Sequence, residues 1–270
     1  MINFPNAKIN IGLNITKKRS DGYHNIASVF YPIAWKDALE VAPSNSFSFA
    51  GTGLEIPGNT DNNLIIKAYE LLPSNVNTKD NVAIHLHKVI PMGAGLGGGS
   101  ADGSFALKLF NDFFKLELSS SSLEDLAAQL GSDCPFFIKN KAVFCYDRGI
   151  KFRDISIDLS SYYIVVVNPK IHISTAEAYS VIKPINPVSS ILDLIKQPIE
   201  NWKSTIHNDF EKPLAAKYPL ISEIKDTLYS SGAVYASMTG SGSTVYGIFK
   251  EPTDLIETFN DLTVWQGKML

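Results

Sequence analysis

In the N-terminal part of the chain, hydrophobic residues alternate with polar ones, a pattern typical of strands with one buried face. In residues 8–15 the isoleucines and the leucine fall on one side, and Asn10 falls on the other. A polar turn at Asp21–Gly22 leads into a second predicted strand from Tyr23. Further strands are predicted near 38–42, 46–50 and 81–91.

Other segments repeat hydrophobic residues at helical spacing. Residues 61–72 form one predicted helix, and a second with a broad apolar face begins directly after Ser100. A third begins with a capping-box pattern, Ser121 to Glu124, and ends at Gly131. The short apolar segments "PFFI" and "AVFCY" that follow are predicted to be strands.

The sequence becomes polar and irregular around 148–160, before a second strand-rich part. We therefore predict two domains, an N-terminal domain over 1–157 and a C-terminal domain over 158–270. In the second we expect a strand at 162–167, helices within 174–230, strands near 233–237 and 244–249, a helix near 252–259 and a last strand.

Composition limits the possible functions. The 270 residues are 45% hydrophobic and 19% charged with a formal net charge of −3, which indicates a globular protein and favours neither nucleic acid nor an anionic membrane as a partner. Cys134 and Cys145, without a CxxC motif, are expected to be buried thiols in a reducing compartment. No signal-peptide pattern opens the chain, and the apolar run 162–167 is too short to span a bilayer, so we expect a cytoplasmic protein.

The stretch "PMGAGLGGGSAD" (91–102) concentrates glycines in one loop. It matches the dinucleotide pattern G-x-G-x-x-G, but the preceding strand alternates, with His85 and His87 on its polar side, where a dinucleotide fold has a strand buried on both faces. No G-K-[ST] follows, which excludes a Walker loop. A flexible linker does not fit either, because a helix follows at once. Glycines before a helix N-terminus present several N–H groups to one anion, so we interpret the loop as a phosphate cradle.

The loop resembles the phosphate loop of the GHMP kinases (galactokinase, homoserine kinase, mevalonate kinase and relatives). "PNAKINIGLNI" resembles their N-terminal strand, and "MTGSGSTVYGIF" (238–249) resembles their second glycine-rich loop. The resemblance implies an α+β fold of two domains, a ribosomal-protein-S5-domain-2-like nucleotide domain and a ferredoxin-like C-terminal domain. Within the family, "KKRSDGYH", "LGSDCPFF" and "NDFE" resemble members that phosphorylate a hydroxyl of a small cytidyl diphosphate substrate.

The resemblance also implies roles for individual residues. Asp133 would be the catalytic base and Lys8 the cation that stabilises the transferring phosphoryl group, because phosphoryl transfer to an alcohol needs both. The ATP-binding residues would be Pro91, Met92, Gly93, Ala94, Gly95, Leu96, Gly97, Gly98, Gly99, Ser100 and Ala101, with Asn63 and Lys88 at the adenine. The substrate-binding residues would be Asn10, Tyr23, His24, Tyr179, Thr239, Gly240, Ser241 and Gly242.

Several of these residues also have a purely structural interpretation. Ser100 is well suited to cap a helix, and its hydroxyl could also coordinate the Mg²⁺ that accompanies ATP. Ala101 departs from the second serine that many relatives carry there. Asp102 is interpreted as an acid that stabilises the helix dipole, and His85 and His87 as surface polar residues rather than a zinc site.

Two other functions stay open at this point. Another GHMP kinase acting on homoserine or mevalonate would not need the aromatic platform of Tyr23, and a nucleotide-binding sensor would not need Lys8 and Asp133. The expected state is a monomer or a weak homodimer that acts on a small molecule, with no nucleic acid and no membrane as partner.

Overall fold

The structure is a computed structural model that describes residues 1–56, 62–73 and 82–270. The chain forms two compact units: unit 1 is Met1–Ala7, Trp35–Met92 and Gly97–Lys141, and unit 2 is Lys8–Ala34, Gly93–Leu96 and Ala142–Leu270. The N-terminal third of the chain therefore contributes to both units. The boundary that we predicted between residues 157 and 158 does not coincide with this division, because each unit combines separate segments of the chain. The two contiguous domains therefore stay a prediction.

Unit 1 contains a four-stranded sheet in the order β1-β4-β6-β5. Its strands are β1 (Ile2–Asn3), β4 (Ala38–Pro43), β5 (Ser48–Gly53) and β6 (Val82–Lys88). β4 and β6 are antiparallel, with Leu39 opposite Leu86 and Val41 opposite Ile84, whereas β5 runs parallel to β6. All four of these side chains are buried, which confirms the strand predicted near 38–42 and the alternation predicted for 81–91 where the structure describes it.

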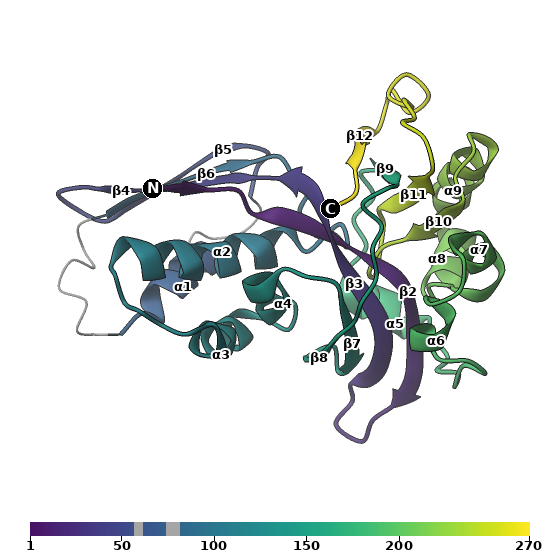
Figure 1. Cartoon of the computed structure of the whole chain (residues 1–270), viewed down its shortest axis with the longest axis horizontal. Coiled ribbons are helices and arrows are strands. Elements are labelled where there is room, and N and C mark those ends of the chain that lie inside the picture. Colours follow the sequence, from purple (N-terminus) through teal and green to yellow (C-terminus); the bar gives the residue numbers. More distant parts are fainter. Residues whose placement is uncertain (57–61, 74–81) are drawn as a thin grey trace. The chain divides into compact units, whose positions relative to one another are not determined.

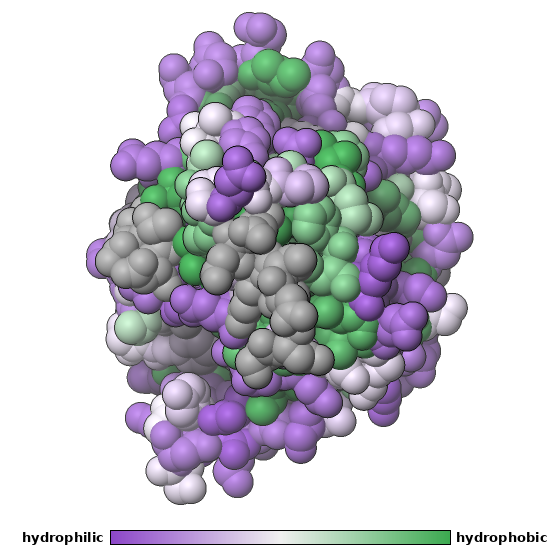
Figure 2. All heavy atoms as spheres, turned by 90° about the vertical axis from the view of Figure 1, so that its left-hand side faces the viewer, coloured by the Kyte–Doolittle hydropathy of each residue, from purple (hydrophilic) through white to green (hydrophobic). Residues whose placement is uncertain are grey.

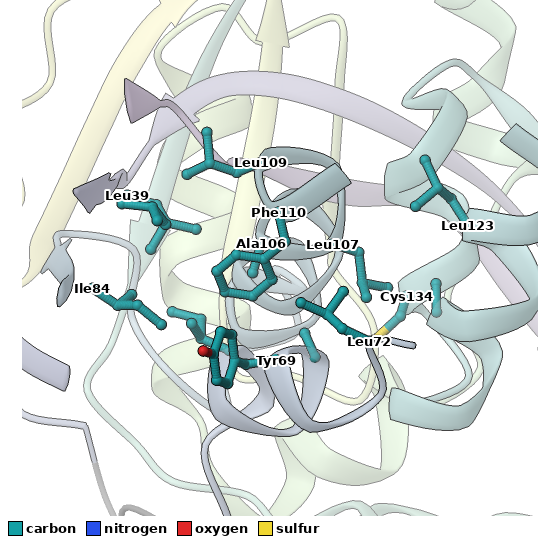
Figure 3. Close-up of a cluster of buried hydrophobic side chains, with 14 of the residues drawn as sticks. Leu39, Tyr69, Leu72, Ile84, Ala106, Leu107, Leu109, Phe110, Leu123 and Cys134 are labelled. Carbon is teal, nitrogen blue, oxygen red and sulfur yellow. The ribbon is translucent and has the colours of Figure 1, made fainter. Parts of the chain in front are cut away.

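Helices cover the buried face of this sheet (Figure 1). They are α1 (Leu64–Glu70), α2 (Gly98–Phe113), α3 (Ser120–Leu130) and α4 (Cys134–Lys139). Figure 3 shows Phe110 and Ala106 of α2 pointing into one cluster with Tyr69 of α1 and with Leu39 and Ile84 of the sheet. This core fixes the start of α2, the helix that follows the glycine loop.

The structure corrects three local predictions in unit 1. α2 begins at Gly98 with Gly97 as its N-cap, so Ser100 lies inside the first turn and does not cap the helix. α3 is capped by Ser119, which accepts a hydrogen bond from the N–H of Ser122, not by Ser121. "PFFI" is helical within α4 because Pro135 fits a first helical turn, and a short apolar run does not distinguish a strand from a buried helix.

Unit 2 contains two four-stranded sheets, in the orders β2-β3-β7-β8 and β10-β11-β9-β12. The strands of the first are β2 (Asn6–Lys18), β3 (His24–Lys36), β7 (Val143–Asp147) and β8 (Lys151–Asp154). Those of the second are β9 (Tyr163–Asn168), β10 (Tyr235–Met238), β11 (Val245–Phe249) and β12 (Thr263–Lys268). The helices are α5 (Thr175–Ser180), α6 (Ile191–Leu194), η2 (Ile199–Asn201), α7 (Trp202–Thr205), α8 (Glu211–Lys217) and α9 (Leu220–Ser230).

Two predictions in unit 2 were wrong. β2 is buried on both faces, because Asn10 is only 1% exposed and bonds to Ser28 and Thr239 on its polar side. Residues 252–259 form no helix: 252–255 are irregular and 256–259 form turns. There Asp254 accepts a hydrogen bond from the N–H of Ile256, and such local bonds compete with helix formation.

The remaining strand and helix predictions agree with the structure where it describes the chain. Residues 61 and 81, which began the predicted helix 61–72 and the predicted strand 81–91, lie outside the described residues. On the face drawn in Figure 2, hydrophobic residues lie between hydrophilic ones. Among the described parts of the chain, no helix combines the length and the apolar character that crossing a bilayer requires.

Candidate functional site

The glycine loop has a backbone that only glycine adopts easily. Gly93, Gly95 and Gly97 have φ values of +63°, +78° and +70°, so every second residue of the loop is left-handed. Alternation of this kind turns successive N–H groups toward one side and forms a concave anion site. The loop leads directly into α2 through the N-cap residue Gly97, which has no side chain and therefore leaves the first N–H groups of the helix without a side-chain cap. The predicted phosphate cradle therefore has a suitable backbone.

In unit 2 the glycine loop lies against the second glycine-rich loop. A Cβ atom added to Gly95 would lie 2.1 Å from the carbonyl oxygen of Thr239, and one added to Gly240 would lie 3.0 Å from the Cα atom of Gly95. The hydroxyl of Thr239 donates to the carbonyl oxygen of Gly95 at 2.9 Å. Both loops were predicted from the sequence, and the structure brings them into direct contact.

Lys8 and Asn10 of β2 join this contact. The ammonium of Lys8 donates to Asn10 Oδ1 at 2.6 Å and to the carbonyl oxygen of Gly95 at 3.0 Å, and it lies 4.8 Å from the ring centroid of Phe30. The N–H of Asn10 donates to the hydroxyl of Thr239 at 3.0 Å. Lys8 is only 3% exposed, and Asn10 and the first glycine loop hold its ammonium in place, so it is not a solvated surface charge.

Asn208, from the "NDFE" segment, holds the second loop in position. Its Nδ2 donates to the carbonyl oxygens of Met238 and Gly240, both at 2.8 Å. Its Oδ1 accepts from the N–H of Phe210 at 3.0 Å. Thr239 is fully buried, so the predicted substrate loop Thr239–Gly242 presents mainly its backbone and Ser241.

We expect Gly95→Ala to destabilise unit 2 and to lower activity. The methyl group would collide with the Thr239 carbonyl, in a conformation that alanine rarely adopts, at a cost of more than about 1 kcal/mol. Urea denaturation measures the loss, and Gly232→Ala is the matched control, because Gly232 has φ of +98° but nothing within 4 Å of the added Cβ. Equal losses in the two variants would contradict the close packing at Gly95.

A pocket of about 420 Å³ lies within unit 1, in the size range of small-molecule sites. Phe49, Leu86 and Met92 contribute apolar walls, and Asn63 contributes a polar group. Asn63 Oδ1 caps α1 by accepting a hydrogen bond from the N–H of Ile65 at 2.9 Å. The Nδ2 group of the same amide is a donor that this capping bond does not use. Gly99 of the α2 N-terminus also lines the pocket, so the pocket adjoins the phosphate loop.

Lys88 forms a buried charge cluster beside this pocket. Its fully buried ammonium donates to a carboxylate oxygen of Asp37 and to Asp102 Oδ2, the latter at 2.8 Å. Asp37 Oδ1 also accepts from the N–H groups of Val89 and Ile90. Lys88 was predicted to contact adenine directly; in the structure its ammonium binds the two carboxylates, and of these three side chains only Asp102 lines the pocket.

Asp133 and Ser100 are both half-buried residues of unit 1. Asp133 is the N-cap residue of α4 by position, but its carboxylate makes no capping bond. The thiol of the next residue, Cys134, interacts with both. Burial raises the pKa of this thiol to about 11, and the negative charge of Asp133 also raises it. A hydrogen bond with Ser100 acts in the opposite direction and lowers the pKa. The predicted base and the predicted metal ligand thus approach the same thiol.

The predicted substrate aromatics lie in unit 2. The ring of His24 stacks on Tyr179 with centroids 5.0 Å apart, and Tyr179 packs edge-on against Phe210 at 4.9 Å. Tyr23 is 60% exposed, and the guanidinium carbon of Arg148 lies 4.9 Å from its ring centroid. Tyr23, His24 and Tyr179 were all predicted to bind the substrate; in the structure His24 is the ring that lies against Tyr179.

Other predicted residues contribute through the backbone. The side chains of Ala94, Leu96 and Ala101 are buried, so only their main-chain atoms could meet a phosphate. His85 and His87 share the hydroxyl of Thr52, at 3.1 and 3.0 Å. Among the described residues, no group of three or more His, Cys, Asp or Glu side chains could hold a metal ion. Both cysteines are free and buried, as predicted.

Sequence reasoning missed Asp37 and the pairing of Asp102. Neither lies in a recognisable motif: Asp37 follows Trp35 and Lys36 in a link between strands, 51 residues before Lys88. The one signal available for Asp102 was that an acidic residue lies within the apolar part of a predicted helix. We interpreted this acid as a group that stabilises the helix dipole, and not as the partner of a buried cation. Ser28 was also missed, although it accepts from Asn10 at 2.8 Å and donates to the carbonyl oxygen of Gly12.

Comparison with known proteins places these motifs in a family. Residues 63–141 match the family model for "GHMP kinases N terminal domain" and residues 190–263 match "GHMP kinases C terminal". A protein of Parabacteroides distasonis named "4-diphosphocytidyl-2-C-methyl-D-erythritol kinase" is 46% identical over 271 residues, which cover 100% of both chains. One of the same name from Bacteroides fragilis is 51% identical over 253 residues, which cover 92% of both chains.

Solved structures show the same fold. The crystal structure of a 4-(cytidine 5'-diphospho)-2C-methyl-D-erythritol kinase matches with a TM-score of 0.84 and 27% identity, covering 100% of this chain and 99% of that one. A mevalonate kinase matches with a TM-score of 0.75 at 16% identity, over 100% and 99% of the two chains. These matches confirm the predicted two-domain α+β fold. With both family models, full-length relatives and a site built from two glycine loops, the chain belongs to the GHMP kinase family.

Proposed function

We propose that the protein transfers the γ-phosphoryl group of ATP to the 2-hydroxyl of 4-diphosphocytidyl-2-C-methyl-D-erythritol, a step of the non-mevalonate route to isoprenoid precursors. The observation that carries the proposal is that relatives 46–51% identical over nearly the whole chain bear this name. The site residues support it, because the loop, the cation, the carboxylate and the aromatic pair are all present in the chain.

The carboxylate of Asp133 takes the proton of the acceptor hydroxyl. The hydroxyl oxygen then forms a bond to the γ-phosphorus, while the bond from that phosphorus to the bridging oxygen breaks and ADP leaves. Because the transition state spreads negative charge over the transferred group, most of the catalysis is positioning and electrostatic stabilisation. Lys8, held by Asn10 and Gly95, supplies a fixed positive charge for this purpose.

Unit 1 supplies the nucleotide site. The pocket lined by Asn63 and Met92 takes the adenine, and the N–H groups of Gly97–Ser100 take the phosphates. The hydroxyl oxygen of Ser100 would bind Mg²⁺, a hard cation that commonly keeps waters and uses only one or two protein ligands beside substrate phosphates. When bound with ATP, Mg²⁺ neutralises charge on the β- and γ-phosphates.

The acceptor is recognised through its cytosine ring. Each stack of a base on an aromatic side chain contributes roughly 1–3 kcal/mol. We expect Tyr179→Ala to weaken binding of the cytidyl substrate by about that amount, because the variant loses the ring that His24 now contacts, and to leave ATP affinity unchanged. Tyr23→Ala is expected to act in the same direction. Calorimetric titration with each ligand measures both effects.

Tyr146→Ala is the matched control for these two variants. Tyr146 is another partly exposed tyrosine of unit 2, and its ring stacks on Phe144. If both test variants bind the cytidyl substrate as the wild type does, the aromatic recognition is refuted, and a kinase for a smaller alcohol becomes the better interpretation.

One assay separates the candidate functions. ATP consumption is measured with the cytidyl substrate, with homoserine, with mevalonate and without an acceptor. The proposal expects turnover with the first acceptor alone. Turnover with another acceptor would indicate a different GHMP kinase, and binding of ATP without any turnover would indicate a sensor. A cytoplasmic location and a monomeric or weakly dimeric state stay predictions from the sequence.

A further inference from the structure

The imidazole of His172 lies against the first residue of the glycine loop. A Cβ atom added to Gly93 would lie 3.5 Å from both the Cε1 and the Nδ1 atom of the His172 ring. Leaving aside the chain neighbours of Gly93, no other atom of the described residues lies within 4 Å of that position. Gly93 has a left-handed backbone and belongs to the predicted phosphate cradle. The space beside the cradle is therefore open at this point, and the imidazole forms part of its wall.

The backbone of His172 is fixed by the second glycine-rich loop. The carbonyl oxygen of Ile171 accepts a hydrogen bond from the hydroxyl of Ser243 at 2.6 Å. The side chain of Ile173 is buried, and a Cβ atom added to Gly242 would lie 3.6 Å from its Cδ1 atom. His172 itself is exposed. Because both of its neighbours are packed, His172 presents its ring to solvent from a fixed backbone, which lowers the entropy cost of binding a ligand.

The same segment leads into α5, which carries a predicted substrate-binding ring. Ser174 caps this helix by accepting a hydrogen bond from the N–H of Glu177 at 3.1 Å, and Tyr179 of the helix stacks on His24. His172 at the glycine loop and Tyr179 at the proposed cytosine site therefore belong to one continuous segment of unit 2. The proposed acceptor has a matching order of groups, because its diphosphate joins the cytidine to the alcohol that is phosphorylated.

An imidazole is well suited to bind a phosphate oxygen. The neutral ring has one N–H donor and the cation has two, and a hydrogen bond to a charged acceptor is stronger than one to a neutral acceptor. Glu177 is an acid near this ring: hydrogen bonds from Lys217 and Tyr218 lower its pKa, and the charge of His172 acts in the same direction to a smaller extent. Its Oε1 accepts from Lys217 at 2.6 Å and from Tyr218 at 2.7 Å, so this carboxylate is bound by other groups.

Resting on the kinase function proposed above, we propose that His172 is a further phosphate-binding residue, whose ring N–H donates a hydrogen bond to a phosphate oxygen of a substrate at the glycine loop. Two substrates carry such oxygens, ATP in its triphosphate and the cytidyl acceptor in its diphosphate. Binding measurements with each of them distinguish the two sources. Asp133 stays the proposed base, because His172 contributes to binding and not to proton transfer.

His172→Phe tests the proposal, because it keeps a flat ring against Gly93 and removes the N–H donor. We expect the affinity for at least one of the two substrates to fall about tenfold or more, as the loss of one hydrogen bond to a charged group predicts. Adenosine and cytidine, which lack the phosphates, are expected to bind the variant as they bind the wild type. Calorimetry measures ATP and the cytidyl substrate, and NMR titration measures the weaker nucleosides.

Two conservative variants and one control complete the experiment. His172→Asn and His172→Gln keep an amide N–H donor near the places of Nδ1 and Nε2, so at least one of them is expected to bind both substrates within about threefold of the wild type. His207→Phe is the matched control, because His207 is another exposed histidine of unit 2 and is not among the groups within 4 Å of the Gly93 position. It is expected to leave all four affinities unchanged.

The outcomes separate this inference from the kinase function. A loss for ATP assigns the imidazole to the triphosphate, and a loss for the cytidyl substrate assigns it to the diphosphate. If His172→Phe binds both substrates as the wild type does, the inference is wrong. It is also wrong if the variant weakens the nucleosides equally, since His172 would then have only a structural role, or if neither amide variant restores binding. In these cases a wild type that phosphorylates the cytidyl substrate retains the proposed function, whereas a wild type without turnover contradicts that function itself.

Discussion

Asp133→Asn is expected to lower turnover of the cytidyl substrate by about 10²-fold or more, because an amide cannot take the proton of the acceptor hydroxyl. The substitution keeps the shape of the side chain, and no capping bond of α4 is lost, because the carboxylate makes none. Binding of ATP is expected to be unchanged, since the phosphate loop and the adenine pocket are untouched. Steady-state rates at saturating ATP, together with calorimetry, measure the two quantities separately.

Asp125→Asn is the matched control for this prediction. Asp125 is an exposed acid on α3 of the same unit, so the same chemical change there removes a charge without a catalytic consequence. If Asp133→Asn turns over at the rate of this control, Asp133 has a structural role, and the mechanism needs another base. A fall in both turnover and ATP affinity would instead indicate that the phosphate loop has moved.

The glycine loop and its neighbours were predictable because their signal is local. A left-handed backbone such as that of Gly93 and Gly95 strongly favours glycine, so the sequence itself indicates this conformation. The alternation in 8–15 likewise predicted β2 and placed Lys8 and Asn10 on the same face. What the alternation did not reveal is that this face is buried, because Thr239 and Ser28, which cover it, are distant in sequence.

The buried charge cluster was not predictable for the same reason. Lys88 looked like a charge at the end of a strand, and its two partners come from a strand connection 51 residues earlier and from a helix 14 residues later. Only the folded chain brings them together. The wrong prediction for α4 has a different cause. A four-residue apolar segment is too short for its periodicity to distinguish a strand from a helix, so the packing of neighbouring elements determines which of the two forms.

Lys88→Met is expected to lower the free energy of unfolding by about 3–5 kcal/mol at pH 8, the usual cost of removing one partner from a buried ion pair. Methionine can fill the volume, but Asp37 and Asp102 would be left as buried carboxylates without a cation. Urea denaturation measures the loss. Lys139→Met is the control, because Lys139 is 55% exposed and pairs with Glu124 at the surface, where such pairs contribute about 0–1 kcal/mol.

The loss in Lys88→Met is expected to shrink as the pH falls. The pKa of Asp102 is already raised to about 7 in the folded protein, chiefly by burial, and removing the Lys88 charge raises it further. A carboxyl whose pKa is raised by folding favours the folded state below its unfolded pKa of about 4, and this contribution is lost as the pH rises through the folded value. The variant should therefore lie closer to the wild type at pH 5 than at pH 8. A deficit that is the same at both values would show that the lost stability comes from packing around Lys88 and not from the two carboxylates.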